Sequence, residues 1–215
     1  MTTFIQVLLG SIALSIVHAS IPNHWLPLIT IGRTERWTQK ETLSVTAIAG
    51  VAHTFSTIII GIIVGVLGYT LSTSYQTVTT LIAPAILILL GLVYLGIDWK
   101  ENRHRVHHHH IDAENIVGTK KRNMSAIALS LAVGMFFSPC IEIEAYYFCA
   151  GMLGWLGIIT VSTVYFFITV AGMLTLVSIG MKGVEKFKFH FLEHHEKLTT
   201  GSILIMLGIA TFVIH

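Results

Sequence analysis

Long apolar stretches separated by short polar ones dominate this chain. Six apolar stretches are predicted, and they cover residues 3–31, 42–71, 80–99, 124–150, 155–181 and 199–215. A helix of about 20 apolar residues is long enough to cross a hydrocarbon layer of about 30 Å. The pattern therefore predicts an all-α membrane protein with six transmembrane helices.

Composition agrees with this prediction. Of the 215 residues, 53% are hydrophobic and 11% are charged, whereas a soluble domain carries about 25% charged residues. Neither Lys nor Arg precedes the first apolar stretch, so we expect a membrane span there rather than a cleaved signal peptide. Both cysteines, Cys140 and Cys149, lie in one apolar stretch, which gives no disulfide framework. A net charge of +2 does not indicate nucleic-acid binding.

The basic residues predict an orientation. All 13 fall in connections one, three and five, which are residues 32–41, 100–123 and 182–198. Loops rich in Lys and Arg stay on the cytoplasmic side. We therefore expect these three connections to be cytoplasmic, both termini to lie outside, and the protein to sit in a cell (inner or plasma) membrane.

The odd number of spans on each side of the long third connection predicts an internal symmetry. Residues 1–99 form the first three-helix repeat, residues 124–215 form the second, and residues 100–123 connect them. The two repeats would have inverted topology, a common plan among transporters. Each half opens on a span that carries a proline beside polar residues, Pro22 and Pro139. Residues 182–197 read as an amphipathic segment on the membrane surface.

Two histidines interrupt the first predicted span. His18 and His24 flank Pro22 and Asn23 in the sequence His-Ala-Ser-Ile-Pro-Asn-His. Residues six apart point about 120° away from each other on a regular helix, so the imidazoles converge only if Pro22 opens the helix. The plainer alternative is a pair of packing histidines hydrogen-bonded to other helices. Ionisable groups inside a membrane are more often functional.

Further polar groups lie in spans two and four. His53 stands among small residues at the expected depth of His24; alone it would be typical of a packing histidine. Cys140, Glu142 and Glu144 follow Pro139. Cys140 and Glu144 share a helical face, and a bound cation would stabilise buried carboxylates. The alternative for one of them is a protonated, hydrogen-bonded carboxyl group.

Imidazole, thiolate and carboxylate together suit a first-row divalent metal such as Ni, Co, Zn, Fe or Mn better than Mg or Ca. A second group of histidines lies in the cytoplasmic connections, where histidine-rich tracts are typical of metal binding. A solvated loop with incidental histidines is the alternative. The group comprises His104, His107, His108, His109, His110, His190, His194 and His195.

The stretch from His18 to His24 resembles the His-x4-Asp-His signature of the nickel/cobalt transporter families (NiCoT and NicO), within the wider lysine-exporter-like superfamily. His53 followed by Thr and Ser resembles the second motif of these families, and Pro139-Cys140 resembles the element that opens their second half. The resemblance implies metal contacts at His18, Asn23, His24 and His53. Asn23 replaces the usual acid, so Glu142 and Glu144 would supply the missing charge.

Three functions follow from these features. The first is transport of a divalent transition metal, with the bilayer and the metal ion as partners; a homo-oligomer is compatible with it. The second is a membrane di-iron hydroxylase or desaturase, because residues 104–108 and 190–195 resemble histidine boxes. The third is a thiol-electron carrier, which the first half disfavours because it contains no cysteine.

Overall fold

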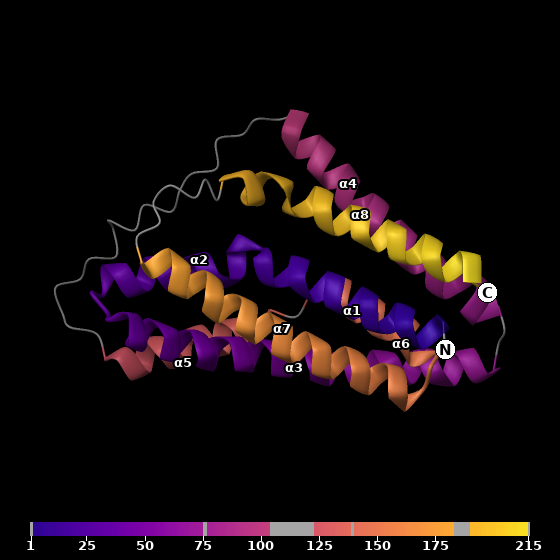
Figure 1. Ribbon diagram of the computed structural model, residues 1–215, viewed down its shortest axis with the longest axis horizontal. Coiled ribbons are helices and arrows are strands. Elements are labelled where there is room, and N and C mark those ends of the chain that lie inside the picture. The colour runs from indigo at the N-terminus through magenta and orange to yellow at the C-terminus, as the bar shows by residue number, and fades with distance from the viewer. Residues whose placement is uncertain (1, 75–76, 104–122, 139, 183–189, 215) are drawn as a thin grey trace.

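The computed structural model describes residues 2–74, 77–103, 123–138, 140–182 and 190–214. All of the regular secondary structure within these ranges is helical (Figure 1). The elements are α1 (Thr2–Ser20), α2 (Pro22–Thr34), α3 (Gln39–Ser74), the π-helical turn η1 (Val78–Ile82), α4 (Ala83–Arg103), α5 (Met124–Phe136), α6 (Ile141–Gly151), α7 (Trp155–Met181) and α8 (His190–Ile214).

Several helices are long and apolar enough to span a membrane. Four stretches meet this description: residues 4–34, 39–74, 80–100 and 155–181. The pair α5 and α6 makes a fifth if the two helices, bent by 51°, form one span. The apolar part of α8, Lys197–Phe212, is shorter. The helical membrane architecture thus agrees with the sequence, while the count of six spans stays a prediction.

The first span is broken where the sequence places its proline. Ile21 separates α1 from α2 and has an extended backbone, with φ −63° and ψ 121°. Pro22 is the first residue of α2, a position that tolerates proline because its missing N–H would have had no intrahelical partner. The break turns the chain between His18 and His24, so these two side chains no longer follow regular helical spacing.

A second break separates α5 from α6. The backbone of Cys140 is extended, with φ −105° and ψ 109°, and α6 begins at the next residue. Helical hydrogen bonds resume when the amides of Ile143 and Glu144 donate to the carbonyl oxygen of Cys140. Each half of the chain therefore opens on a helix that is interrupted inside the apolar region.

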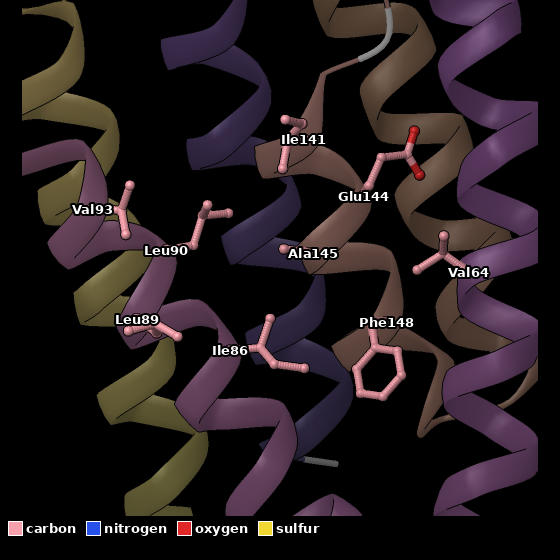
Figure 2. Close-up of a pocket in the computed structure, with 9 residues that line it drawn as sticks. All are labelled: Val64, Ile86, Leu89, Leu90, Val93, Ile141, Glu144, Ala145 and Phe148. Atoms are coloured by element: carbon pink, nitrogen blue, oxygen red, sulfur yellow. The ribbon is translucent and has the colours of Figure 1, made fainter. Parts of the chain in front are cut away.

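The helices pack as a main body with a further pair, α4 and α8, packed on it. In the main body α3 packs against α5, α6 and α7, and α1 packs against α7. Helix α4 packs mainly against α8, and this pair lies along one side of the body (Figure 1). An apolar pocket of about 400 Å³ lies between α3, α4 and α6 (Figure 2). Both helix breaks lie within the main body.

Candidate metal centre

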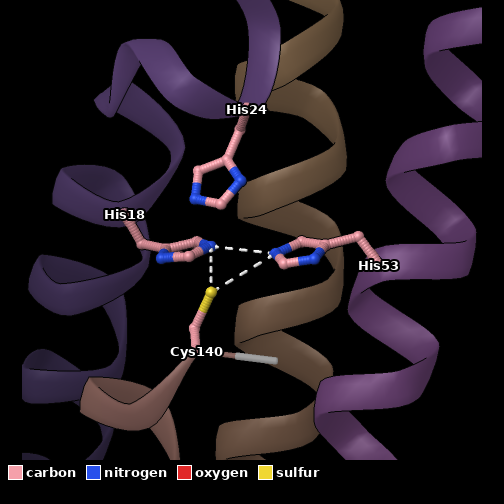
Figure 3. Close-up of side chains that lie close together, drawn as sticks. All are labelled: His18, His24, His53 and Cys140. Carbon is pink, nitrogen blue, oxygen red and sulfur yellow. Dashed lines mark hydrogen bonds between the residues drawn. The ribbon is translucent and has the colours of Figure 1, made fainter. Parts of the chain in front are cut away.

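Four side chains from different elements converge inside the main body. His18 comes from the last turn of α1, His24 from the first turn of α2, His53 from α3, and Cys140 from the residue before α6 (Figure 3). Each offers one ligand atom, and these four atoms lie within 4.8 Å of one another. His18 and His53 are 1% and 0% exposed, and Cys140 is 8% exposed. The group could hold a metal ion.

The spacing of three of these atoms matches a tetrahedral metal site. The Nε2 atoms of His18 and His53 are 3.3 Å apart, and Sγ of Cys140 lies 3.6 Å from the first and 3.5 Å from the second. Zinc bonds of about 2.0–2.1 Å to nitrogen and about 2.3 Å to sulfur, at tetrahedral angles, separate nitrogens by about 3.3 Å and nitrogen from sulfur by about 3.6 Å. The three atoms are therefore already spaced as ligands of one ion.

Hydrogen bonds on the far side of each ring direct the Nε2 atoms inward. Nδ1 of His53 donates to the carbonyl oxygen of Met135 at 3.1 Å. Nδ1 of His18 donates to Oε1 of Glu142 at 3.3 Å. In a neutral imidazole the other nitrogen then carries a lone pair, so two lone pairs face each other in the group. A cation between the rings would satisfy both of them.

His24 completes the fourth side of the group. Its ring centre lies 4.5 Å from that of His18 and 4.8 Å from that of His53. In Figure 3 the ring points from above toward the triangle formed by the other three ligand atoms. This approach depends on the break at Ile21, because a continuous helix would place the two histidines of the first span on different faces.

Two tyrosines that were not predicted from the sequence also contact residues of this centre. The hydroxyl group of Tyr165 lies 3.3 Å from Nε2 of His18 and 3.4 Å from Nε2 of His53, and Tyr165 is fully buried. The hydroxyl group of Tyr94 donates to Oε2 of Glu142 at 3.0 Å. The sequence contains no distinct signal for Tyr165, because α7 also carries several Ser and Thr hydroxyl groups and the spacing of Tyr165 from other residues indicated no partner.

The acidic candidates that the structure describes do not belong to the group of four, although one of them contacts it. Asn23 is exposed. Glu142 contacts His18 from behind rather than joining the group, and Glu144 lies outside it. Two sets of candidate histidines lie outside the part of the chain that the structure describes. They are His104, His107, His108, His109 and His110, and the side chains of His190, His194 and His195 at the start of α8.

Comparisons with known proteins found no relative of this chain. No protein-family model, curated protein or solved structure matches the chain. The interpretation of the centre therefore rests on its own geometry.

Proposed function

We propose that this protein transports a divalent transition-metal ion across a membrane through the His18–His24–His53–Cys140 centre. The function resembles that of the nickel/cobalt transporter families. The observation that carries the proposal is the triangle of ligand atoms 3.3–3.6 Å apart, buried inside a bundle of apolar helices.

The ligand set favours zinc within the Ni, Co, Zn, Fe and Mn class. Imidazole and thiolate ligands in a tetrahedral arrangement are typical of zinc sites, whereas magnesium and calcium prefer oxygen ligands. Cobalt(II) accepts the same tetrahedral geometry and serves as a coloured substitute. The triangle leaves little room for the octahedral oxygen shell that the harder ions need.

Transport, rather than a purely structural role for the metal, is supported by the broken helices. Two of the four ligand positions, His24 and Cys140, stand at or beside helix breaks within apolar segments. Discontinuous membrane helices are a common way to build a substrate site that opens alternately to each side. The breaks stand in corresponding positions of the two halves, which supports the inverted-repeat arrangement as part of this proposal.

Metal binding is tested by loading the purified protein with cobalt. We expect a single ion per chain and a thiolate-to-cobalt charge-transfer band in the near ultraviolet. Cys140→Ser should abolish the band. Cys149→Ser is the matched control, because Cys149 is also buried but contacts the carbonyl oxygen of Ala83 instead of the histidines. A band that survives Cys140→Ser would contradict the proposed ligand set.

Transport is tested separately in proteoliposomes that contain a zinc-sensitive dye. The wild-type protein should carry zinc across the bilayer, and His53→Ala should reduce the flux to that of protein-free vesicles. A wild-type protein that binds one ion tightly but gives no flux in either direction would contradict transport and would make the centre structural.

A further inference from the structure

Glu144 is a buried carboxylate that the metal centre does not use. Both of its carboxylate oxygens are buried, and within the described residues neither has a hydrogen-bond partner. Such a group is strongly unfavourable when ionised and, when protonated, still leaves an O–H donor unsatisfied. Around it lie the aliphatic side chains that line the pocket between α3, α4 and α6, among them Val64, Ile141 and Ala145. Among the residues that the structure describes, no hydrogen bond to Glu144 offsets this cost.

The position of Glu144 relates it to the metal centre. It follows Cys140 by four residues, and its backbone amide donates to the carbonyl oxygen of Cys140 at 3.2 Å, so Glu144 stands one turn into α6 from this ligand. Figure 2 shows the carboxylate turned toward α3, the helix that also carries His53. Because α6 runs toward the end of the molecule where both termini lie (Figure 1), Glu144 stands on that side of the centre.

We propose that Glu144 is a second contact for the metal ion, on the side of the centre that faces the termini. An ion leaving toward that side would meet Glu144 after the His and Cys ligands, and an ion arriving from that side would meet it before them. This inference rests on the proposed transport function. A centre with four protein ligands holds its ion firmly, and a weaker contact nearby would let the ion leave in steps. A single carboxylate completed by water molecules binds a divalent ion more weakly than three imidazoles and a thiolate do.

We expect one variant to keep metal binding and lose zinc flux. Glu144→Gln should keep the cobalt charge-transfer band and the single ion per chain, because all four ligands remain, and its zinc flux should fall to that of protein-free vesicles. Glu144→Asp retains the carboxylate and should restore part of the flux. Glu35→Gln is the control, since it removes a carboxylate that lies between α2 and α3, and it should leave both readouts unchanged.

Other results overturn the inference in distinguishable ways. Wild-type flux in Glu144→Gln would show that the ion does not need this carboxylate. Loss of the cobalt band in Glu144→Gln would make Glu144 part of the primary centre instead of a second contact. Absence of flux in the wild-type protein would overturn the transport proposal itself, and this inference with it.

Discussion

Glu142 contacts the candidate metal centre from behind His18 and is not one of its four ligands. One carboxylate oxygen accepts from His18 and the other accepts from Tyr94, so the carboxylate is held from two helices. A carboxylate behind a metal-binding imidazole orients the ring and raises its basicity. The two glutamates of α6 thus have different surroundings: Glu142 is hydrogen-bonded on both oxygens, and Glu144 on neither.

Glu142→Gln should weaken metal binding without abolishing it. The amide oxygen can still accept from His18, but the negative charge is lost, and changes of this kind typically cost about 10- to 100-fold in metal affinity. Competition with a chromophoric chelator measures the effect. Glu41→Gln is the control, because Glu41 contacts Thr38 at the start of α3, about 18 Å along the helix from His53. An unchanged affinity in Glu142→Gln would contradict the orienting role.

Metal affinity should rise with pH. The imidazoles must be neutral and the Cys140 thiol must lose its proton before they bind an ion. Where the histidines are already neutral, the thiol alone releases one proton per ion bound, so affinity should increase about tenfold per pH unit. Titrations with zinc at several pH values measure this slope. Cys140→Ala should bind more weakly and show a flatter slope at neutral pH, and an equally steep slope in that variant would contradict the assignment.

At the scale of whole elements, the close approach of α3 to α6 holds Cys140 against His53. A side chain at Gly151 would collide with the backbone of Gly65, and a side chain at Gly61 would collide with the ring of Tyr147. Small residues allow membrane helices to approach closely and gain van der Waals contacts. The glycines of α3 and α6 therefore determine how near the two halves of the centre come.

Gly151→Ala should destabilise the protein, because the new methyl group forces the backbone of α3 away. Overpacking of this kind typically costs about 1–3 kcal/mol. Thermal unfolding in detergent, followed by tryptophan fluorescence, measures the loss. Gly134→Ala is the control: a methyl group there meets no atom within 4 Å, and alanine favours helix more than glycine does. Equal melting temperatures for the two variants would contradict the packing argument.

The sequence predicted much of the helical architecture and included the four residues that the structure brings together, but it also named Asn23, Glu142 and Glu144 as ligands, and it could not predict tertiary contacts. A proline between two histidines predicted the break at Pro22, because proline cannot continue the helical hydrogen bonds. The partners of Glu142 could not be predicted, since Tyr94 reaches it only through the packing of α4 beside α6. The role of Tyr165 depends in the same way on α7 crossing α1 and α3. Periodicity indicates where helices lie but not which helices become neighbours.

Across the whole molecule, basic residues distant in sequence gather at one end. The guanidinium group of Arg33 donates to the carbonyl oxygen of Gly180 at 2.8 Å, which joins the end of α2 to the end of α7. Lys182 follows two residues later, and Gln39 at the start of α3 donates to Ser178 at 2.8 Å. Both termini lie at the opposite end (Figure 1). This arrangement fits the predicted orientation, in which connections one and five share a side.

Reporter fusions expressed in a bacterial inner membrane test that orientation. Alkaline phosphatase is active only outside the cytoplasm, and green fluorescent protein folds well only inside it. A phosphatase fused after His215 should be active, whereas fluorescent protein fused after Lys40 or Lys182 should be bright, because positively charged connections remain in the cytoplasm. Replacing Arg33, Arg36 and Lys40 with Gln should lower the fluorescence of the Lys40 fusion. The reverse pattern would place the termini and Glu144 toward the cytoplasm, so the ion would meet the carboxylate on the cytoplasmic side of the four ligands.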